Sequence, residues 1–329
     1  MQNIINAYTL SFVILSAFVF AAFLLYIIRR KELLNIIPVL ASFATVYLLY
    51  RLIGVAGTAG YYNLLALDLC IALVSTILAI FYISKPYIFV GLVILLAAGF
   101  VIYASGNAGS TAFAGMFAIG TIYGIMYREF AMPTKRREQS KMKKREINRD
   151  VLQIILGIAL VGIVVLFPYT AAVSIIFALI LLSYTSNNLL ANLRLGSLYR
   201  RAMDLERRGV TFGQGAIYLA ASTALVMGFT GSSKLLLFGI AVLFFADSLA
   251  TIIGVSARRA AQLPYNRYKT IVGTLTFFIV AAVAGYLTIG LYGVLFALIL
   301  AFVESLNLSI DDNIRSGVVI VILNALVAI

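Results

Sequence analysis

The 329-residue chain has no histidine, no tryptophan and a single cysteine, Cys70. These absences exclude zinc sites of the usual His/Cys type, a histidine general base and an intramolecular disulfide. Charged residues are also scarce, at 11%, whereas 63% of the residues are hydrophobic. A soluble domain has about 25% charged and about 45–50% apolar residues, so this chain has too little charge to cover a soluble surface. The composition therefore predicts an integral membrane protein that crosses the bilayer many times.

Long apolar runs predict an all-α, polytopic helix bundle. A spanning helix needs about 20 apolar residues, and the runs do not alternate as membrane β-strands do. Cutting the sequence at charges and at Gly, Pro and Asn clusters gives about twelve transmembrane helices, at 7–28, 34–50, 64–84, 87–103, 110–127, 151–168, 171–186, 213–229, 235–255, 270–288, 291–306 and 317–329.

The basic residues predict the orientation of these spans. With the N-terminus outside, 23 Lys and Arg fall in inner loops, and only Arg51 and Lys234 fall in outer ones. This asymmetry is what the positive-inside rule requires. The net charge of +13 is thus explained first by cytoplasmic loops and only second by anionic substrates. We expect membrane lipids as partners and no nucleic acid. The first apolar run lacks a basic start, and we interpret it as a retained span.

Charge also divides the chain into three regions. Residues 1–127 form an N-terminal membrane region of about five spans, residues 128–150 a basic cytoplasmic loop, and residues 151–329 a C-terminal membrane region of about seven spans. The loop is interpreted as a solvated segment that sets topology, with contact to lipid headgroups as the alternative.

Three acidic residues are notable for their positions in or beside predicted spans: Asp68, Asp247 and Glu304. A charged Asp at the bilayer centre costs about 2.5–3.5 kcal/mol, so it needs a partner or a water-filled cavity. Asp247 lies about eight residues from the inner end of its span and is a candidate catalytic or metal-binding residue; the alternative is a polar clamp between helices. Asp68 lies about one turn from the outer end; a polar clamp between helices is the first interpretation, and reach to the outer interface is the alternative.

Cations and glycines gather on the inner side after Asp247, where the next helix begins. Free N–H groups and the helix dipole at a helix N-terminus favour phosphate, and nearby cations add to this field. We therefore predict a nucleotide-binding site made of Arg258, Arg259, Arg267, Lys269, Thr270 and Gly273.

A second group on the inner side consists of carboxylates and amides. It contains Glu304, Asn307, Asp311, Asp312 and Asn313. Mg²⁺ is usually held by one or two carboxylates, waters and substrate phosphates. We predict a Mg²⁺ site that combines Asp311, Asp312, Asn313 and Glu304 with Asp247; a solvated helix connection is the alternative.

Three sequence elements occur in a fixed order on this face. They are Asp247-Ser-Leu-Ala250-Thr-Ile-Ile-Gly254, then Lys269-Thr-Ile-Val-Gly273-Thr274, then Glu304 with Asp311-Asp312-Asn313. In order and spacing they resemble the family of dolichol kinase, phytol kinase and CTP-dependent diacylglycerol kinase. The likeness covers about residues 205–329. The first two elements are also similar to phosphatidate cytidylyltransferases.

The resemblance implies a lipid-alcohol kinase that transfers a phosphoryl group from CTP, with Mg²⁺, to dolichol, another polyprenol or a related lipid alcohol. The active site would face the cytoplasm, in the cell membrane or, in a eukaryote, the endoplasmic reticulum membrane. Two alternatives stay open. One is a cytidylyltransferase that makes a CDP-lipid. The other is a secondary transporter, since many spans and intramembrane Asp residues suit one.

Overall fold

A computed structural model describes residues 33–52, 61–81, 109–131, 143–190, 214–257, 261–308 and 310–327, together with parts of 14–29. The elements are a 3₁₀ turn η1 (Leu33–Asn35), α2 (Ile36–Leu52), α3 (Tyr61–Phe81), α5 (Gly109–Ala131), α6 (Lys143–Leu166), α7 (Tyr169–Leu190), α9 (Gln214–Thr230), α10 (Ser233–Ile240), a π-helical turn η3 (Ala241–Ala246), α11 (Asp247–Ser256), β1 (Gln262–Leu263), β2 (Asn266–Thr270), α12 (Ile271–Ile289), α13 (Leu291–Ser305) and α14 (Asp312–Val327). The all-α prediction is confirmed, with one short antiparallel hairpin, β1–β2, added to it.

Four described segments are long and apolar enough to cross a membrane. They are Leu33–Leu52, Ile147–Leu166, Ser233–Ser256 and Ile271–Ile289. Shorter apolar helices such as α13 accompany them. The predicted spans 7–28 and 87–103 lie largely or wholly outside the described residues. The count of twelve and the outward N-terminus remain predictions.

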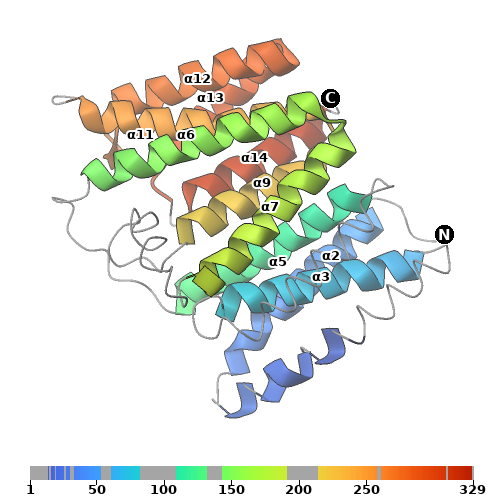
Figure 1. The fold of residues 1–329 in the computed structure, drawn as a ribbon. Helices are drawn as coiled ribbons and strands as arrows, with labels where there is room; N and C mark the ends of the chain where they lie inside the picture. Colours follow the sequence, from blue (N-terminus) through green and yellow to red (C-terminus); the bar gives the residue numbers. More distant parts are fainter. Residues whose placement is uncertain are drawn as a thin grey trace.

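The helices lie side by side in two connected groups (Figure 1). Helices α2, α3 and α5 pack together, and α5 packs in turn against α9. From α9 the contacts continue through α14 and α13 to α12, while α6 covers the segment from α10 to α11. Glycines permit the close contact between the groups: a Cβ at Gly115 of α5 would stand 3.5 Å from Cα of Gly228 in α9. The two groups are thus joined through helix backbones.

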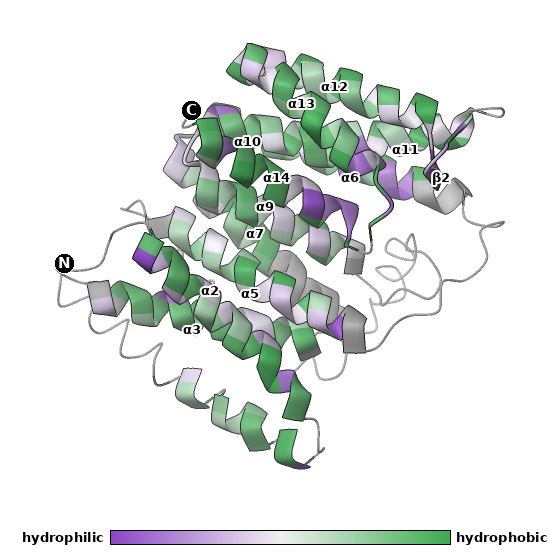
Figure 2. Ribbon diagram, turned by 180° about the vertical axis from the view of Figure 1, so that it is seen from behind, coloured by the Kyte–Doolittle hydropathy of each residue, from purple (hydrophilic) through white to green (hydrophobic). Residues whose placement is uncertain are grey.

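The helices consist of hydrophobic residues along much of their length (Figure 2), and many of these residues are exposed. On α12 and α13, Leu275, Ile279, Val283, Leu295 and Phe302 are all exposed. Patches of this kind are rare on soluble monomers and are what lipid-facing helices require. The surface therefore agrees with helices able to cross a membrane.

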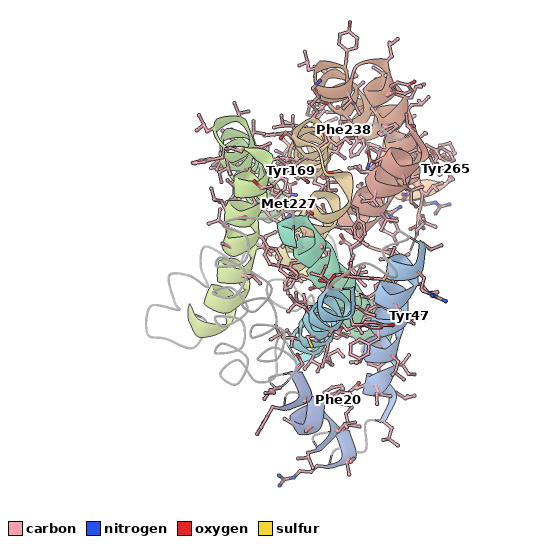
Figure 3. All side chains as sticks on the ribbon, turned by 90° about the vertical axis from the view of Figure 1, so that its right-hand side faces the viewer. Phe20, Tyr47, Tyr169, Met227, Phe238 and Tyr265 are labelled. Atoms are coloured by element: carbon pink, nitrogen blue, oxygen red, sulfur yellow. The ribbon has the colours of Figure 1, made fainter. Side chains whose placement is uncertain are left out.

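The interior combines apolar packing with isolated polar contacts. Phe238 of α10 is fully buried and meets Phe296 of α13 with ring centroids 6.2 Å apart. The Tyr169 hydroxyl donates to the backbone carbonyl of Met227 at 2.8 Å, which fixes the start of α7 to α9 (Figure 3).

One expected boundary needs correction, and one of the two interpretations of Asp68 agrees with the structure. The predicted loop 128–150 is shorter than expected, because α5 continues to Ala131 and α6 begins at Lys143. The predicted loop bounds lie where charged residues end the apolar runs. Charged residues such as Lys, Arg and Glu are good helix formers, so the helices continue past the ends of the apolar runs. Asp68 lies seven residues into α3, is 1% exposed and bonds to Tyr50 of α2, as a polar clamp between helices requires, so it does not reach the outer interface. Packing of α2 against α3 covers it.

Candidate functional site

The first element of the site is the π-helical turn that precedes Asp247. The Asp247 amide donates to the carbonyl of Val242, five residues back, instead of to Leu243, four residues back. The side-chain amide of Gln153 in α6 donates to the Leu243 carbonyl at 3.1 Å. Single π-turns inside α-helices occur frequently at functional sites. Asp247 is thus half-buried and opens α11 directly after a widened turn, and this turn is bonded to α6.

The second element is the β1–β2 hairpin, which leads directly into α12. Asn266 is buried, and its Nδ2 donates to the Ser305 carbonyl at 2.9 Å. The Tyr265 hydroxyl lies 2.9 Å from the Ser305 Oγ. These contacts attach the hairpin to the end of α13. Thr270 then caps α12, with its Oγ1 accepting from the Gly273 amide at 3.1 Å.

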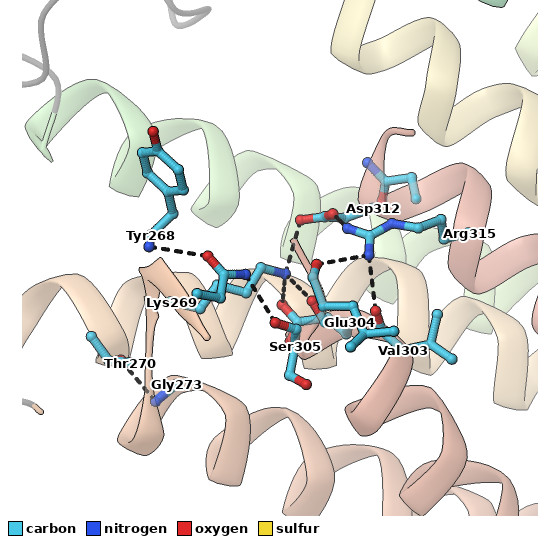
Figure 4. A network of polar contacts seen from close by, with 12 residues as sticks. Tyr268, Lys269, Thr270, Gly273, Val303, Glu304, Ser305, Asp312 and Arg315 are labelled. Carbon is cyan, nitrogen blue, oxygen red and sulfur yellow. Dashed lines mark hydrogen bonds and ion pairs between the residues drawn. The ribbon is translucent and has the colours of Figure 1, made fainter. Parts of the chain in front are cut away.

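Lys269 connects the hairpin to two carboxylates from different helices (Figure 4). Its ammonium forms an ion pair with Glu304, donates to the Glu304 carbonyl at 2.6 Å, and lies 3.0 Å from Asp312 Oδ2. Glu304 is 7% exposed, whereas the Asp312 side chain is 38% exposed. The Lys269 contacts thus range from a buried carboxylate to one that solvent reaches.

Arg315 completes this network from the first turns of α14. Its guanidinium pairs with Asp312, and Nη1 donates to the carbonyls of Val303 and Leu306 at 2.9 and 3.1 Å. A cation bonded to the last carbonyls of α13 is favoured by the helix dipole. Arg315 therefore fixes the junction of α13 and α14. In the sequence it is only one of the 23 basic residues of the inner loops, so this role was not predicted.

Asp247 lies within electrostatic range of the same network, since it interacts with both Glu304 and Arg315. The structure therefore brings together Asp247, Lys269, Glu304 and Asp312, although they come from four separate elements. Arg267, which the sequence also predicted as a nucleotide ligand, is exposed on β2. Arg258 and Arg259 lie outside the described residues.

Glycines bring α11 and α12 into contact beside this network. A Cβ at Gly273 would stand 3.1 Å from the Ala250 carbonyl, and one at Gly254 would stand 2.9 Å from Thr270 Oγ1. Both contacts are tighter than ordinary packing distances. The glycines of the two motifs therefore set the distance between the Asp247 helix and the N-terminus of α12.

The acidic residues differ in their partners. Asp311 Oδ1 accepts from the Asn313 amide at 2.9 Å and so caps α14, and both Asp312 and Asn313 belong to the first helical turn.

Two buried oxygens of this site, Glu304 Oε2 and Asn313 Oδ1, have no hydrogen-bond partner. Within the described part of the chain, no three Asp, Glu, His or Cys residues gather closely enough to hold a metal by themselves. The predicted Mg²⁺ site therefore stays a prediction, since an ion here would need substrate phosphates and waters as further ligands.

Fold and surface together define an all-α protein with several helices able to cross a membrane. The chain is 32% identical to the uncharacterized protein MJ1137 of Methanocaldococcus jannaschii over 180 residues, which cover 52% of this chain and 87% of the archaeal protein. The chain belongs to the same family as this archaeal protein. No model of a known protein family and no solved structure matches it.

Proposed function

We propose that the protein is a CTP-dependent kinase that phosphorylates a membrane lipid alcohol, with dolichol or another polyprenol as the preferred acceptor class. The observation that carries the proposal is the position of Lys269 at the entrance of α12, in contact with Glu304 and Asp312 and near Asp247. The three sequence elements that resemble lipid-alcohol kinases thus meet at one end of the helix bundle.

The charges of this network suit a triphosphate. Lys269 and the capped N-terminus of α12 supply positive potential for phosphate oxygens. Lys269 is neutralised by Glu304 and Asp312. An incoming triphosphate competes for the Lys269 ammonium and releases these carboxylates. Glu304 and Asp312, with the unpartnered Asn313 oxygen, would then hold a Mg²⁺ ion that neutralises phosphate charge.

Asp247 is the residue we assign to the acceptor. Phosphoryl transfer depends on positioning and charge stabilisation more than on covalent chemistry by the protein. The Asp247 carboxylate orients the lipid hydroxyl and accepts its proton as the new oxygen–phosphorus bond forms. The bond between the β- and γ-phosphates of CTP breaks, and CDP leaves.

Substrate solubility explains the place of the site. The tail of a lipid alcohol is apolar, so its hydroxyl stays at the membrane interface, whereas CTP arrives from water. The network lies where the hairpin and α13 end and α14 begins, beside an exposed apolar surface on α12 that includes Ile271, Val272 and Leu275. This surface offers a path along which a lipid tail lies while its hydroxyl reaches Asp247.

A labelling experiment tests the proposal. Purified protein in lipid nanodiscs is incubated with CTP, ATP or GTP and with a lipid alcohol (dolichol, a shorter prenol, phytol or diacylglycerol) or a phosphorylated lipid (phosphatidate). We expect label from the γ-phosphate of CTP to enter the lipid, with release of CDP. Label from the α-phosphate, with release of pyrophosphate, would identify a cytidylyltransferase instead. Absence of label with every pair, from protein that is folded, would contradict both enzyme assignments and favour a transporter.

A further inference from the structure

A buried carboxyl far from this site has no role in the proposed reaction. Asp68 lies on α3, and its Oδ2 accepts a hydrogen bond from the Tyr50 hydroxyl of α2. Its other oxygen, Oδ1, is buried and has no hydrogen-bond partner. The side chain is thus a carboxyl group with one satisfied and one unsatisfied oxygen inside a helix bundle.

The helices around Asp68 place other charges at a distance. On α2, Tyr50 is followed by Arg51, whose side chain is exposed. Helix α5 runs in the same direction as α3, because its Gly120 meets Ala72 and Ser75 and its Gly124 meets Ala79. The charged residues of α5, Arg128 and Glu129, therefore lie beyond the level of Ala79, well past Asp68.

Two further groups near Asp68 can ionise or form hydrogen bonds. Cys70, buried on the same helix, interacts with Asp68 electrostatically and with Ser16 by a hydrogen bond. The next hydroxyls along α3, Ser75 and Thr76, lie about two turns away and donate to carbonyls of their own helix, at 2.7 and 2.6 Å. Among the described side chains, no cation pairs with Asp68.

Ionising Asp68 costs free energy here, because the buried carboxylate has one hydroxyl donor, that of Tyr50, in place of the water that would surround it in solution. A hard metal cation would also be poorly held, since such ions take several oxygen ligands. A proton, in contrast, binds to one carboxyl oxygen and needs no further oxygen ligands. Once protonated, the carboxyl can donate to the Tyr50 oxygen, and the hydrogen bond persists with its direction reversed.

We propose that Asp68 and Tyr50 form a proton-binding site inside the N-terminal helix group, separate from the phosphoryl-transfer site. The carboxyl takes up and releases a proton, and the Tyr50 hydroxyl stabilises the charged form by donating to it. Ionisable residues inside membrane bundles commonly serve proton pathways. The assignment does not depend on the kinase proposal.

Infrared difference spectroscopy between wild type and Asp68→Asn tests the site. We expect a protonated-carboxyl band at acidic pH that is replaced by a carboxylate band at alkaline pH. A carboxylate band throughout, or a protonated band that never changes, would overturn the proposal. The Asn variant keeps the size of the side chain and an acceptor for Tyr50, so it should fold.

Tyr50→Phe provides a second test in protein that retains Asp68. Without the Tyr50 donor the charged form is less stable, so the carboxyl band should persist to higher pH. An unchanged transition would contradict the role of Tyr50. Adding sodium or potassium should leave the transition in place; a shift to lower pH would show that a metal cation competes for the site, and the assignment to a proton would fall.

Discussion

The side-chain amide of Gln153 donates to the Leu243 carbonyl over 3.1 Å and so joins α6 to the π-turn before Asp247. In a regular α-helix the Asp247 amide would bond to this carbonyl, but here it bonds to Val242. The π-turn shifts every later side chain of the helix, including that of Asp247, relative to the preceding turns. We therefore expect Gln153 to stabilise the π-turn, and with it the direction in which the Asp247 side chain points relative to Glu304.

Replacing Gln153 by Met should test this connection, because Met has similar size and no donor. We expect kcat to fall several-fold, with little change in KM for CTP, since Gln153 does not touch the nucleotide. The lost hydrogen bond should also cost about 1 kcal/mol of stability. Steady-state kinetics and thermal unfolding in detergent measure both effects. Equal losses of activity and of folded protein would instead assign Gln153 to stability alone.

Asp247→Asn preserves shape and removes the charge. If Asp247 orients the acceptor and accepts its proton, this variant should lose almost all turnover while it remains folded and inserted in the membrane. A residual activity above about a tenth corresponds to a barrier change below about 1.4 kcal/mol, which is too small for an essential group. Turnover of CTP with a saturating lipid alcohol, compared at equal amounts of folded protein, decides the point.

Lys269→Ala should weaken nucleotide use more than lipid use. Its ammonium is the cation that the described residues place between Glu304 and Asp312, and we assign it to the triphosphate. We expect KM for CTP to rise at least tenfold, about 1.4 kcal/mol of binding free energy, while KM for the lipid changes little. Lys234→Ala, at an exposed position near the start of α10, is the matched control and should behave as wild type.

The helix pattern could be predicted closely where local chemistry marks the ends. The predicted spans 270–288 and 291–306 correspond to α12 and α13 within one residue. Thr270 supplies a cap, and Gly290 adopts a left-handed turn with φ of 69° between the two helices. The π-turn could not be predicted, because Ala241–Ala246 is uniformly apolar and contains no residue that marks an insertion.

The site could be predicted only in part. The motif residues Asp247, Lys269, Glu304 and Asp312 were identified from charge in an apolar sequence; the last three are in contact, and Asp247 lies within electrostatic range of Glu304. Gln153 and Asn266 were missed, because a single amide in or near a span carries no signal until packing shows which carbonyl it reaches. The sequence alone could not decide between a helix clamp and the outer interface for Asp68, because its distance from a helix end is local but its burial depends on α2.

Gly273→Ala should destabilise the protein, because its Cβ would meet the Ala250 carbonyl at 3.1 Å and force α11 and α12 apart. Overpacking of this kind costs about 1–3 kcal/mol. Gly162→Ala in α6 is the matched control: nothing lies within 4 Å of its Cβ, and removing a helical glycine stabilises by up to about 1 kcal/mol. Thermal unfolding in detergent should therefore move in opposite directions for the two variants. Equal behaviour would show that contact between α11 and α12 is not tight.

Asp312→Asn should change the metal requirement of the reaction. Asp312 contacts both Lys269 and Arg315 and is partly exposed, so it is the carboxylate that an incoming Mg²⁺–triphosphate reaches first. We expect the Mg²⁺ concentration for half-maximal activity to rise several-fold before the KM for the lipid alcohol changes. Asp311→Asn is the comparison, because Asn keeps the oxygen that caps α14 and caps as well as Asp. The shift should be larger at Asp312 than at Asp311. If neither variant alters the Mg²⁺ dependence, the carboxylates serve only to hold Lys269 and Arg315, and the metal is bound by Asp247 and the nucleotide alone.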